Sequence, residues 1–490
     1  MEPAPYGRAA GGGLAAADLP AAPRWARGVA ALALLAFAYF LFRMGGLHID
    51  NRDPDFEYFY KAGAHLRAHG GLDPGYDVIA GAVEYRGTLD WYLPAVPRLM
   101  TLFAALPFRM AGHVWLLLNL AAFFATARLI GRELSGLPPR DWFVTQLGPV
   151  LLLGAYWTWE FRLNQINNFT LLLMVGSFVS WQRGHRTAAG FWLALATLLK
   201  VAPGLLILWF ALKREFRVVA AALLTLALAG PFADAAALGP TRAADAYRGW
   251  WRRAVNSGSH TGLVLDQIET DWRNQGLGVV LSRWLHPTSY STRFDNDPRI
   301  QAKLAAMQPE PPRFLNVVDL PRTAVARVTR LIAGISLVAL FWLARRPARR
   351  LTLWQLRLEW ALFILALLWF MPVLRRYHFI WAFPALAVLG GAIHYASLRS
   401  GWGRLALACI GLSVVLQLPM LSTTARDLGA ADVAAALRAL EAAGVLLFAV
   451  VVLALAIVPL LIRLGRAPDW LEAPPHPHAA AQHSRGVPHA

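Results

Sequence analysis

Apolar runs of about 17 to 24 residues recur along nearly the whole chain, the length that a helix needs to cross a hydrocarbon layer of roughly 30 Å. Charged residues make up only 16% of the 490 residues, below the roughly 25% that is usual in soluble domains. A soluble core is therefore excluded, and the sequence predicts an all-α polytopic membrane protein.

The net charge of +18 would suit a nucleic-acid partner, but most basic residues lie in short clusters between apolar runs. The positive-inside rule explains such clusters and predicts that they are cytoplasmic, so we expect no nucleic acid. They are Arg128, Arg132 and Arg140; Arg183 and Arg186; Lys213, Arg214 and Arg217; Arg345, Arg346, Arg349 and Arg350; Arg399 and Arg404; and Arg463 and Arg466.

The loop after the first apolar run has the opposite charge. Residues 45–90 hold eight acidic residues against four Lys and Arg, which places them on the extracytoplasmic side. The later basic clusters keep to one side only if 91–107, with its two prolines, is an interfacial or re-entrant element. Residues 187–212 have basic residues at both ends, so both ends should lie on the same side of the membrane. The segment is long enough for only one full crossing, and it is therefore predicted to be a short hairpin with its apex at Lys200 to Pro203.

These assignments give about 12 membrane segments with both termini inside. Besides the first run and the two half-helices, the predicted spans are 112–130, 142–158, 166–182, 218–236, 323–343, 355–373, 379–397, 404–421 and 440–462. We expect a single transmembrane domain over 25–467, with outer loops at about 45–111 and 237–322 and flexible cytoplasmic tails at 1–24 and 468–490.

Two carboxylates, Asp53 and Asp55, lie in the first outer loop. Asp55 is placed to begin an interfacial amphipathic helix that carries Phe56, Phe59 and Tyr60 on one side. An aspartate in this position is either a helix cap or, at the level of a lipid headgroup, a general base toward a sugar hydroxyl.

Cationic groups are expected on the same face. Placing the charge of Lys200 unpaired at the middle of the membrane would cost roughly 2.5 to 3.5 kcal/mol of free energy. Its side chain should therefore face a cavity or an anion such as phosphate, or else extend to the membrane interface. Arg375, Arg376 and His378 lie on the outer side, where the positive-inside rule predicts few arginines. Their side chains could bind the oxygens of a phosphate group. The alternative interpretation is that they are only solvated residues at the end of a helix.

Amide side chains complete the set of candidates. Asn164 and Gln165 lie in a turn between two spans, where they can bind sugar hydroxyls or cap a helix. In the large loop, Asn274 and Gln275 follow Trp272, a composition that suits a carbohydrate.

Several kinds of chemistry are excluded by what the sequence lacks. It has no P-loop, GxGxxG, HExxH or GxSxG motif, and Cys409, its only cysteine, excludes an intrachain disulfide. We expect no metal and no cofactor, so the energy for any group transfer must come with the substrate.

Short motifs in a consistent order carry a family resemblance over roughly residues 30 to 390. They are Asp55-Phe56 with Tyr58, Tyr60, Ala62 and Gly63; Tyr92-Leu93-Pro94; Asn164-Gln165-Ile166-Asn167; Lys200 to Pro203; and Asn274-Gln275-Gly276-Leu277. The chain resembles the GT-C superfamily of membrane glycosyltransferases. Within it, the chain is most similar to bacterial polyprenyl-phosphate-mannose-dependent mannosyltransferases, which include phosphatidylinositol-mannoside mannosyltransferases and were formerly a domain of unknown function.

The resemblance implies a GT-C-type fold and an enzyme of the plasma (inner) membrane whose active site lies on the extracytoplasmic face. It implies that mannose or another hexose passes from a polyprenyl-phosphate donor to a glycolipid or polysaccharide acceptor, by inverting displacement with Asp55 as the base. The candidate substrate-binding residues are Asp53, Asn164, Gln165, Lys200, Asn274, Gln275, Arg375, Arg376 and His378. Gly276 departs from the family pattern, which usually has serine there.

Two other functions stay open. A transporter or flippase of lipid-linked saccharides would use the same cations and the broken hairpin. A non-catalytic scaffold of envelope synthesis would need neither Asp55 nor Lys200.

Overall fold

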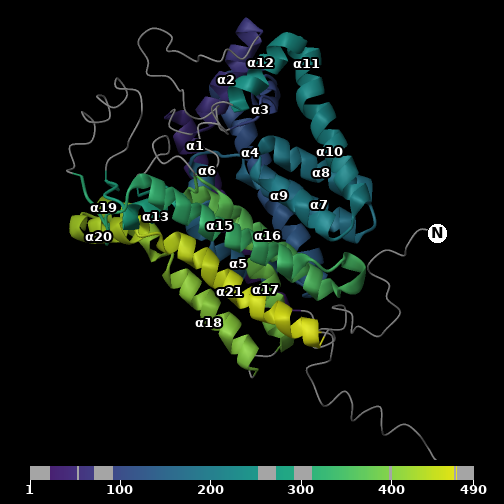
Figure 1. Ribbon diagram of the computed structural model, residues 1–490, viewed down its shortest axis with the longest axis vertical. Helices are drawn as coiled ribbons and strands as arrows, with labels where there is room; N and C mark the ends of the chain where they lie inside the picture. Colours follow the sequence, from purple (N-terminus) through teal and green to yellow (C-terminus); the bar gives the residue numbers. More distant parts are fainter. Residues whose placement is uncertain are drawn as a thin grey trace, which may run out of the picture.

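The computed structural model describes residues 22–51, 55–70, 92–251, 272–291, 312–396, 400–467 and 471. Over these residues the chain is helical and has no strand (Figure 1). Eight of the described helical segments are long and apolar enough to cross a membrane. The expected all-α polytopic architecture is confirmed.

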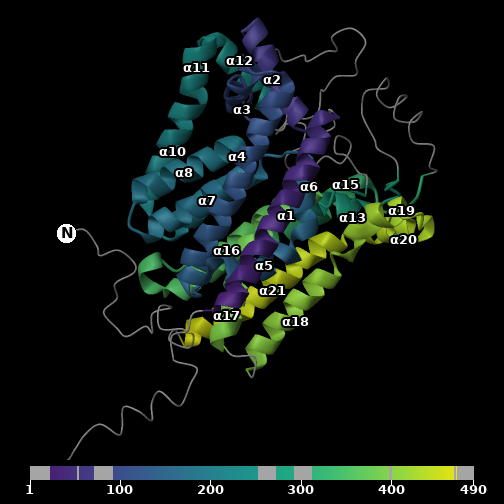
Figure 2. The ribbon, with the colours of Figure 1, turned by 180° about the vertical axis from the view of Figure 1, so that it is seen from behind.

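The helices form two groups that meet along the middle of the bundle (Figures 1 and 2). The first group comprises α1 (Arg24–Asp50), α4 (Phe108–Leu129), α5 (Trp142–Leu152), α6 (Gly154–Arg162), α7 (Asn167–Gln182), α8 (Arg186–Leu199), α9 (Leu205–Leu212), α10 (Phe216–Ala227) and α11 (Ala233–Leu238). The second comprises α15 (Arg322–Ala344), α16 (Leu353–Phe370), the 3-10 segment Arg376–Ala382, α17 (Phe383–Ala396), α18 (Gly401–Val415) and α21 (Val445–Arg466).

Shorter helices gather at one end of the bundle, which we call the α2 end. They are α2 (Phe56–His69), α3 (Ala95–Met100), α12 (Pro240–Trp250), α13 (Leu277–Leu285), α19 (Ser422–Asp427) and α20 (Ala431–Ala442). At the opposite end, Arg27 pairs with Asp141 at 2.9 Å and Arg183 with Glu133 at 2.5 Å. Five of the basic clusters lie together at this end, at residues 128–140, 183–186, 213–217, 345–350 and 463–466. The predicted sorting of loops by charge therefore agrees with the chain path.

The predicted hairpin is present as α8 and α9. Lys200 has extended backbone angles between them, φ −148° and ψ 133°, and a 3-10 turn follows at Ala202–Gly204. The two ends of the hairpin come together, because Arg186 Nε lies 3.0 Å from Glu215 Oε2. Lys200 is thus carried into the bundle from the opposite end without a full crossing.

The segment around α3, Ala95–Ala105, is apolar but shorter than the eight candidate spans, which agrees with the interfacial or re-entrant element expected there. The hydroxyl of Tyr60 donates to the Leu106 carbonyl at 2.9 Å, and a Cβ on Gly63 would lie 2.4 Å from the Met100 carbonyl oxygen. These contacts hold α3 flat against α2 at the α2 end. Phe56 and Phe59 are both buried, Phe56 against Phe108 and Trp115 of α4 and Phe59 against Tyr92, which confirms the amphipathic character predicted for α2.

Two predicted spans have different limits. The span expected at 142–158 is broken at Leu153, four residues after Pro149, so it runs as α5 and α6 to Arg162. The span expected at 440–462 begins at Val445, because Gly444 takes a left-handed conformation with φ 88° and separates α20 from α21.

Close contact between α8 and α10 depends on Gly190. A Cβ at this position would lie 2.4 Å from the Val218 carbonyl oxygen. Gly190→Val is therefore expected to lower the free energy of unfolding by about 1–3 kcal/mol or more, the usual cost of overpacking. Thermal unfolding in detergent measures the loss. The control is Gly334→Val on α15, where a Cβ meets nothing within 4 Å, and equal unfolding temperatures for the two variants would contradict this account.

Candidate functional site

Asp55 lies at the start of α2 but does not cap the helix, because its side chain makes no capping hydrogen bond. Its Oδ2 instead accepts a hydrogen bond from the side-chain Nε2 of Gln165. The next backbone N–H, of Phe56, donates to the Leu163 carbonyl at 3.3 Å. The carboxylate is thus fixed against the turn between α6 and α7. Asp53 lies outside the described residues.

The α6–α7 turn holds its polar side chains by hydrogen bonds inside the protein. Asn164 has φ 51°, and its Nδ2 donates to the Gly112 carbonyl at 3.1 Å. Glu160 Oε1 accepts the backbone N–H of Asn168 at 3.1 Å. The capping predicted for the asparagines is therefore provided by Glu160, and Asn164 shapes the turn that presents Gln165 to Asp55.

Lys200 reaches the second helix group from the hairpin apex. Its Nζ lies 2.5 Å from His378 Nε2 and 5.8 Å from the ring centres of Tyr377 and Trp381. The other ring nitrogen of His378, Nδ1, accepts the backbone N–H of Arg375 at 2.9 Å. Lys200 and His378, which are 178 residues apart, thus form one contact where the two helix groups meet.

The site combines negative and positive groups at short range. Asp55 and Glu160 both act electrostatically on Lys200, and Asp55 also acts on Arg375. Burial raises the pKa of the Tyr92 phenol above its usual range, and the charges of Asp55 and Glu160 raise it further. Tyr92 therefore stays protonated and is available as a hydrogen-bond donor beside the carboxylates.

The two neighbouring arginines have different surroundings. Arg376 is only 4% exposed, and its guanidinium binds both carboxylate oxygens of Glu441, with Nε 2.7 Å from Oε1. It also stacks between Trp159 and Trp272, at 5.1 and 4.9 Å from the ring centres. Arg376 thus ties α20 to the bundle, whereas Arg375 is half-buried on the side of Asp55.

Loss of the Glu441 charge is expected to be costly. Glu441→Gln leaves the buried Arg376 guanidinium without its counter-charge, which typically costs about 3–5 kcal/mol. We expect a much lower unfolding temperature in detergent. Asp432→Asn, at an exposed position of α20, is the matched control, and a Glu441→Gln variant as stable as that control would show that the pair contributes little.

Asn274 and Gln275 fix the wall next to Arg375. Asn274 Oδ1 accepts the backbone N–H groups of Gly276 at 3.0 Å and of Leu374 at 3.1 Å. Gln275 Nε2 donates to the Glu441 carbonyl at 2.8 Å. A Cβ on Gly276 would lie 2.1 Å from the Pro372 carbonyl oxygen, which explains why glycine rather than serine stands there.

Sequence reasoning did not assign a role to Glu160, Glu441 or Tyr92. Glu160 and Glu441 are both fully buried, and in the sequence each is an isolated acidic residue near an apolar run. Acids of this kind are a usable signal, because a buried carboxylate needs a partner. Among the described residues, no group of three or more His, Cys, Asp or Glu side chains is arranged to hold a metal ion.

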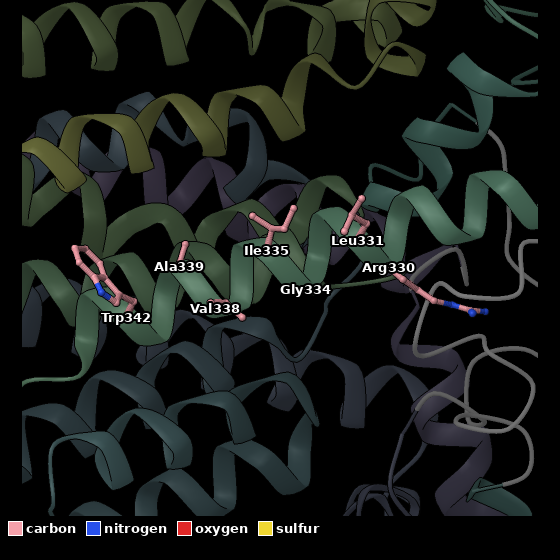
Figure 3. A pocket seen from close by; sticks show the side chains of 7 residues that line it. All are labelled: Arg330, Leu331, Gly334, Ile335, Val338, Ala339 and Trp342. Atoms are coloured by element: carbon pink, nitrogen blue, oxygen red, sulfur yellow. The ribbon is translucent and has the colours of Figure 1, made fainter.

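An open apolar hollow lies on α15, between Arg330 and Trp342 (Figure 3). Its lining is aliphatic and aromatic apart from Arg330, and it contains no carboxylate. Such a surface is typical of a helix face that contacts lipid, and it is not a place for acid–base chemistry.

The comparisons with known proteins agree with a membrane glycosyltransferase. The model of glycosyltransferase family 87 matches residues 92–303, a stretch that includes Glu160, Lys200 and Gln275 but neither Asp55 nor Arg375. This match supports glycosyl transfer as the class of activity. No curated protein and no solved structure matches the chain significantly, so the GT-C-type fold and the mannosyltransferase group stay predictions.

Proposed function

We propose that the protein transfers mannose or another hexose from a polyprenyl-phosphate donor to an acceptor hydroxyl. The observation that carries this proposal is the placement of Asp55 within electrostatic reach of two cations, Lys200 and Arg375. The family match supports the class of reaction. The flat packing of α2 and α3 beside the site suits a substrate whose phosphate lies at the level of the lipid headgroups.

In the proposed reaction Asp55 removes the proton from the acceptor hydroxyl, and the acceptor oxygen bonds to the anomeric carbon of the donor. The bond from that carbon to the phosphate oxygen breaks, and its electron pair leaves with the polyprenyl phosphate. Lys200 and Arg375 stabilise the charge that develops there. A phosphate leaving group needs no proton, so a second carboxylic acid is unnecessary, and the anomeric configuration inverts.

The substrate-binding residues contribute in two ways in this proposal. Lys200 and Arg375 face the phosphate, and His378, whose ring nitrogens contact the Lys200 side chain and the Arg375 backbone N–H, orients these two residues. Gln165 holds the base, and Asn164, Asn274, Gln275 and Arg376 fix the walls on which these groups stand, because their side chains are engaged within the protein. No metal or cofactor takes part in the proposed step.

The basic loops gathered at the opposite end suit the cytoplasmic side of a plasma (inner) membrane. The proposed active site then lies on the extracytoplasmic face. A glycolipid or a polysaccharide of the cell envelope would be the acceptor there, and the donor would arrive through the bilayer among the membrane lipids.

Reconstitution tests the proposal directly. Purified protein in liposomes is incubated with a panel of polyprenyl-phosphate sugars and native membrane lipids, and the products are identified by mass spectrometry. We expect a lipid one hexose heavier and released polyprenyl phosphate. Movement of intact donor across the bilayer without a new glycosidic bond would instead show a flippase.

A further inference from the structure

Two tryptophan rings at the α2 end are surrounded by arginine side chains, which we call the arginine cluster. The cluster comprises Arg162, Arg273, Arg376 and Arg438, stacked on Trp159 and Trp272. Each guanidinium carbon lies between 4.9 and 5.7 Å from a ring centre. Stacking of this kind uses the face of the planar guanidinium and leaves the N–H groups at its edges for hydrogen bonds to a ligand.

Two of these guanidinium groups carry N–H donors that the protein does not use. Arg162 Nε and Arg376 Nη1 are buried and have no hydrogen-bond partner among the described residues. Arg376 is 4% exposed, and its Nε and Nη2 bind Glu441, so Nη1 is the donor that remains. A buried cationic donor without an acceptor is unfavourable, so the cluster needs an anion that the described part of the chain does not supply.

The two unused donors are close to each other and to the candidate base. Arg162 and Arg376 both stack on the ring of Trp159, so one lipid headgroup can reach both. The carbonyl of Leu163, the residue after Arg162, accepts the backbone N–H that follows Asp55 at 3.3 Å. An anion bound at Trp159 would therefore brace the wall of the candidate site.

The helix that carries Arg438 has an apolar face turned away from the bundle. On α20, Val433 is 54% exposed and Leu440 is 50% exposed, and their spacing places them on one face of the helix. Glu441 lies on the buried side. At the end of a membrane-spanning bundle, such a helix lies in the headgroup layer with its apolar face toward the acyl chains. The arginine cluster is thus held at the depth of the lipid phosphates.

We propose that the arginine cluster is a second anion site, which binds the phosphate of an anionic phospholipid from the surrounding membrane. Guanidinium edges match phosphate oxygens, and several arginines together favour a headgroup with a net negative charge. The acyl chains of this lipid would lie along Val433 and Leu440. The site uses neither Lys200 nor Arg375, and it goes beyond the proposed function without resting on it, because it needs no sugar donor and no acceptor.

The test is thermal unfolding of the purified full-length protein in a neutral detergent, after bound lipid has been removed and with phosphatidylglycerol or phosphatidylcholine added. A lipid that binds the folded protein raises its unfolding temperature as the lipid concentration exceeds the Kd. We expect phosphatidylglycerol to raise the unfolding temperature far more than phosphatidylcholine does. Equal responses to the two lipids would overturn the proposal, because the site would then not select a negative headgroup.

Replacement of Arg162 by Gln tests the residues. This variant is expected to need about 10-fold more phosphatidylglycerol or more for the same rise, as for one lost hydrogen bond between charged groups. Its unfolding temperature without lipid should stay near that of the wild type, because Arg162 forms no ion pair with the described residues. An arginine with a merely structural role would show the reverse, with a lower unfolding temperature and an unchanged lipid response, and that result would overturn the proposal.

The matched control is Arg248→Gln. Arg248 is an exposed residue of α12 at the same end of the bundle, where it pairs with Asp245 at 2.8 Å, so its loss changes the net charge by the same amount. We expect a wild-type response to phosphatidylglycerol. If this control lost the response as far as Arg162→Gln did, the lipid would be sensing overall charge, and the site would be wrongly assigned.

Other sources of phosphate are separated by the same measurement. If inorganic phosphate matched phosphatidylglycerol at equal concentration, the acyl chains would play no part and the lipid assignment would be wrong. If undecaprenyl phosphate gave the Arg162-dependent rise and phosphatidylglycerol did not, the cluster would belong to the donor site instead.

A second variant covers the case in which Arg162→Gln does not fold. Arg162→Lys keeps the charge but lacks the planar fork that binds two phosphate oxygens at once. We expect it to weaken the response to phosphatidylglycerol, and an unchanged response would overturn the role given to the guanidinium.

Discussion

Replacement of Asp55 by Asn is expected to reduce sugar transfer by about 10²–10⁴-fold, the contribution of a positioned general base. Asparagine has nearly the same shape and can still accept the hydrogen bond from Gln165, but it does not take a proton from the acceptor hydroxyl. Binding of the polyprenyl-phosphate donor should be retained, because the cations that face the phosphate are untouched. The measurements are turnover in proteoliposomes and donor binding to the same preparation.

The control for Asp55→Asn is Asp50→Asn. Asp50 is an exposed carboxylate at the end of α1, five residues earlier, and its loss changes the local charge by the same amount. Turnover should stay at the wild-type level in this control. Normal turnover in Asp55→Asn itself would exclude Asp55 as the base and would require another group to take the proton from the acceptor hydroxyl.

Those parts of the fold that depend on local chemistry could be predicted from the sequence. Proline disfavours the interior of a helix because it lacks a backbone N–H, and charge balance fixes how often the chain crosses between two basic loops. The hairpin around Lys200 and the flat segment around α3 followed from these two rules. The break at Leu153 was missed, because Pro149 alone does not say whether a span ends or only bends.

The site was harder to predict because its partners are distant in sequence. Arg375 and Arg376 are adjacent, and only the course of α20 decides that Arg376 binds Glu441, 65 residues later. In the same way, the sequence shows Glu160 beside Arg162 in a turn, and only the packing of α7 against that turn buries it. Residue type thus indicated which groups are reactive, but tertiary packing decides which of them face the site.

Asp55 shows the limit most clearly. A carboxylate before a helix predicts a cap on local grounds, but the Asp55 side chain makes no capping hydrogen bond, and the Phe56 N–H donates to the Leu163 carbonyl instead. The side chain turns away because Gln165 supplies a donor from a turn 110 residues later. A local rule is overridden here by a tertiary contact, which is the kind of departure expected at a functional site.

Lys200→Met is expected to reduce the turnover number by about 10²–10³-fold, the typical loss when one donor that stabilises developing charge is removed. Methionine keeps the length and apolar contacts of the side chain but leaves the leaving phosphate with one cation fewer. Lys200→Arg should recover part of the activity, because it restores the charge with a bulkier head that must fit beside His378 and between the rings of Tyr377 and Trp381.

The comparison that makes the Lys200 result specific is Lys61→Met. Lys61 lies on the exposed side of α2, where its Nζ is 3.2 Å from Glu57, so its loss removes a positive charge at the same end of the bundle without changing the site. Turnover should be unaffected there.

If Lys61→Met and Lys200→Met lost activity equally, the effect would come from general surface charge, and Arg375 would be left as the main cation for the phosphate. If Lys200→Met lost only donor affinity at unchanged turnover number, Lys200 would bind the ground state and not the charge that develops as the glycosidic bond breaks.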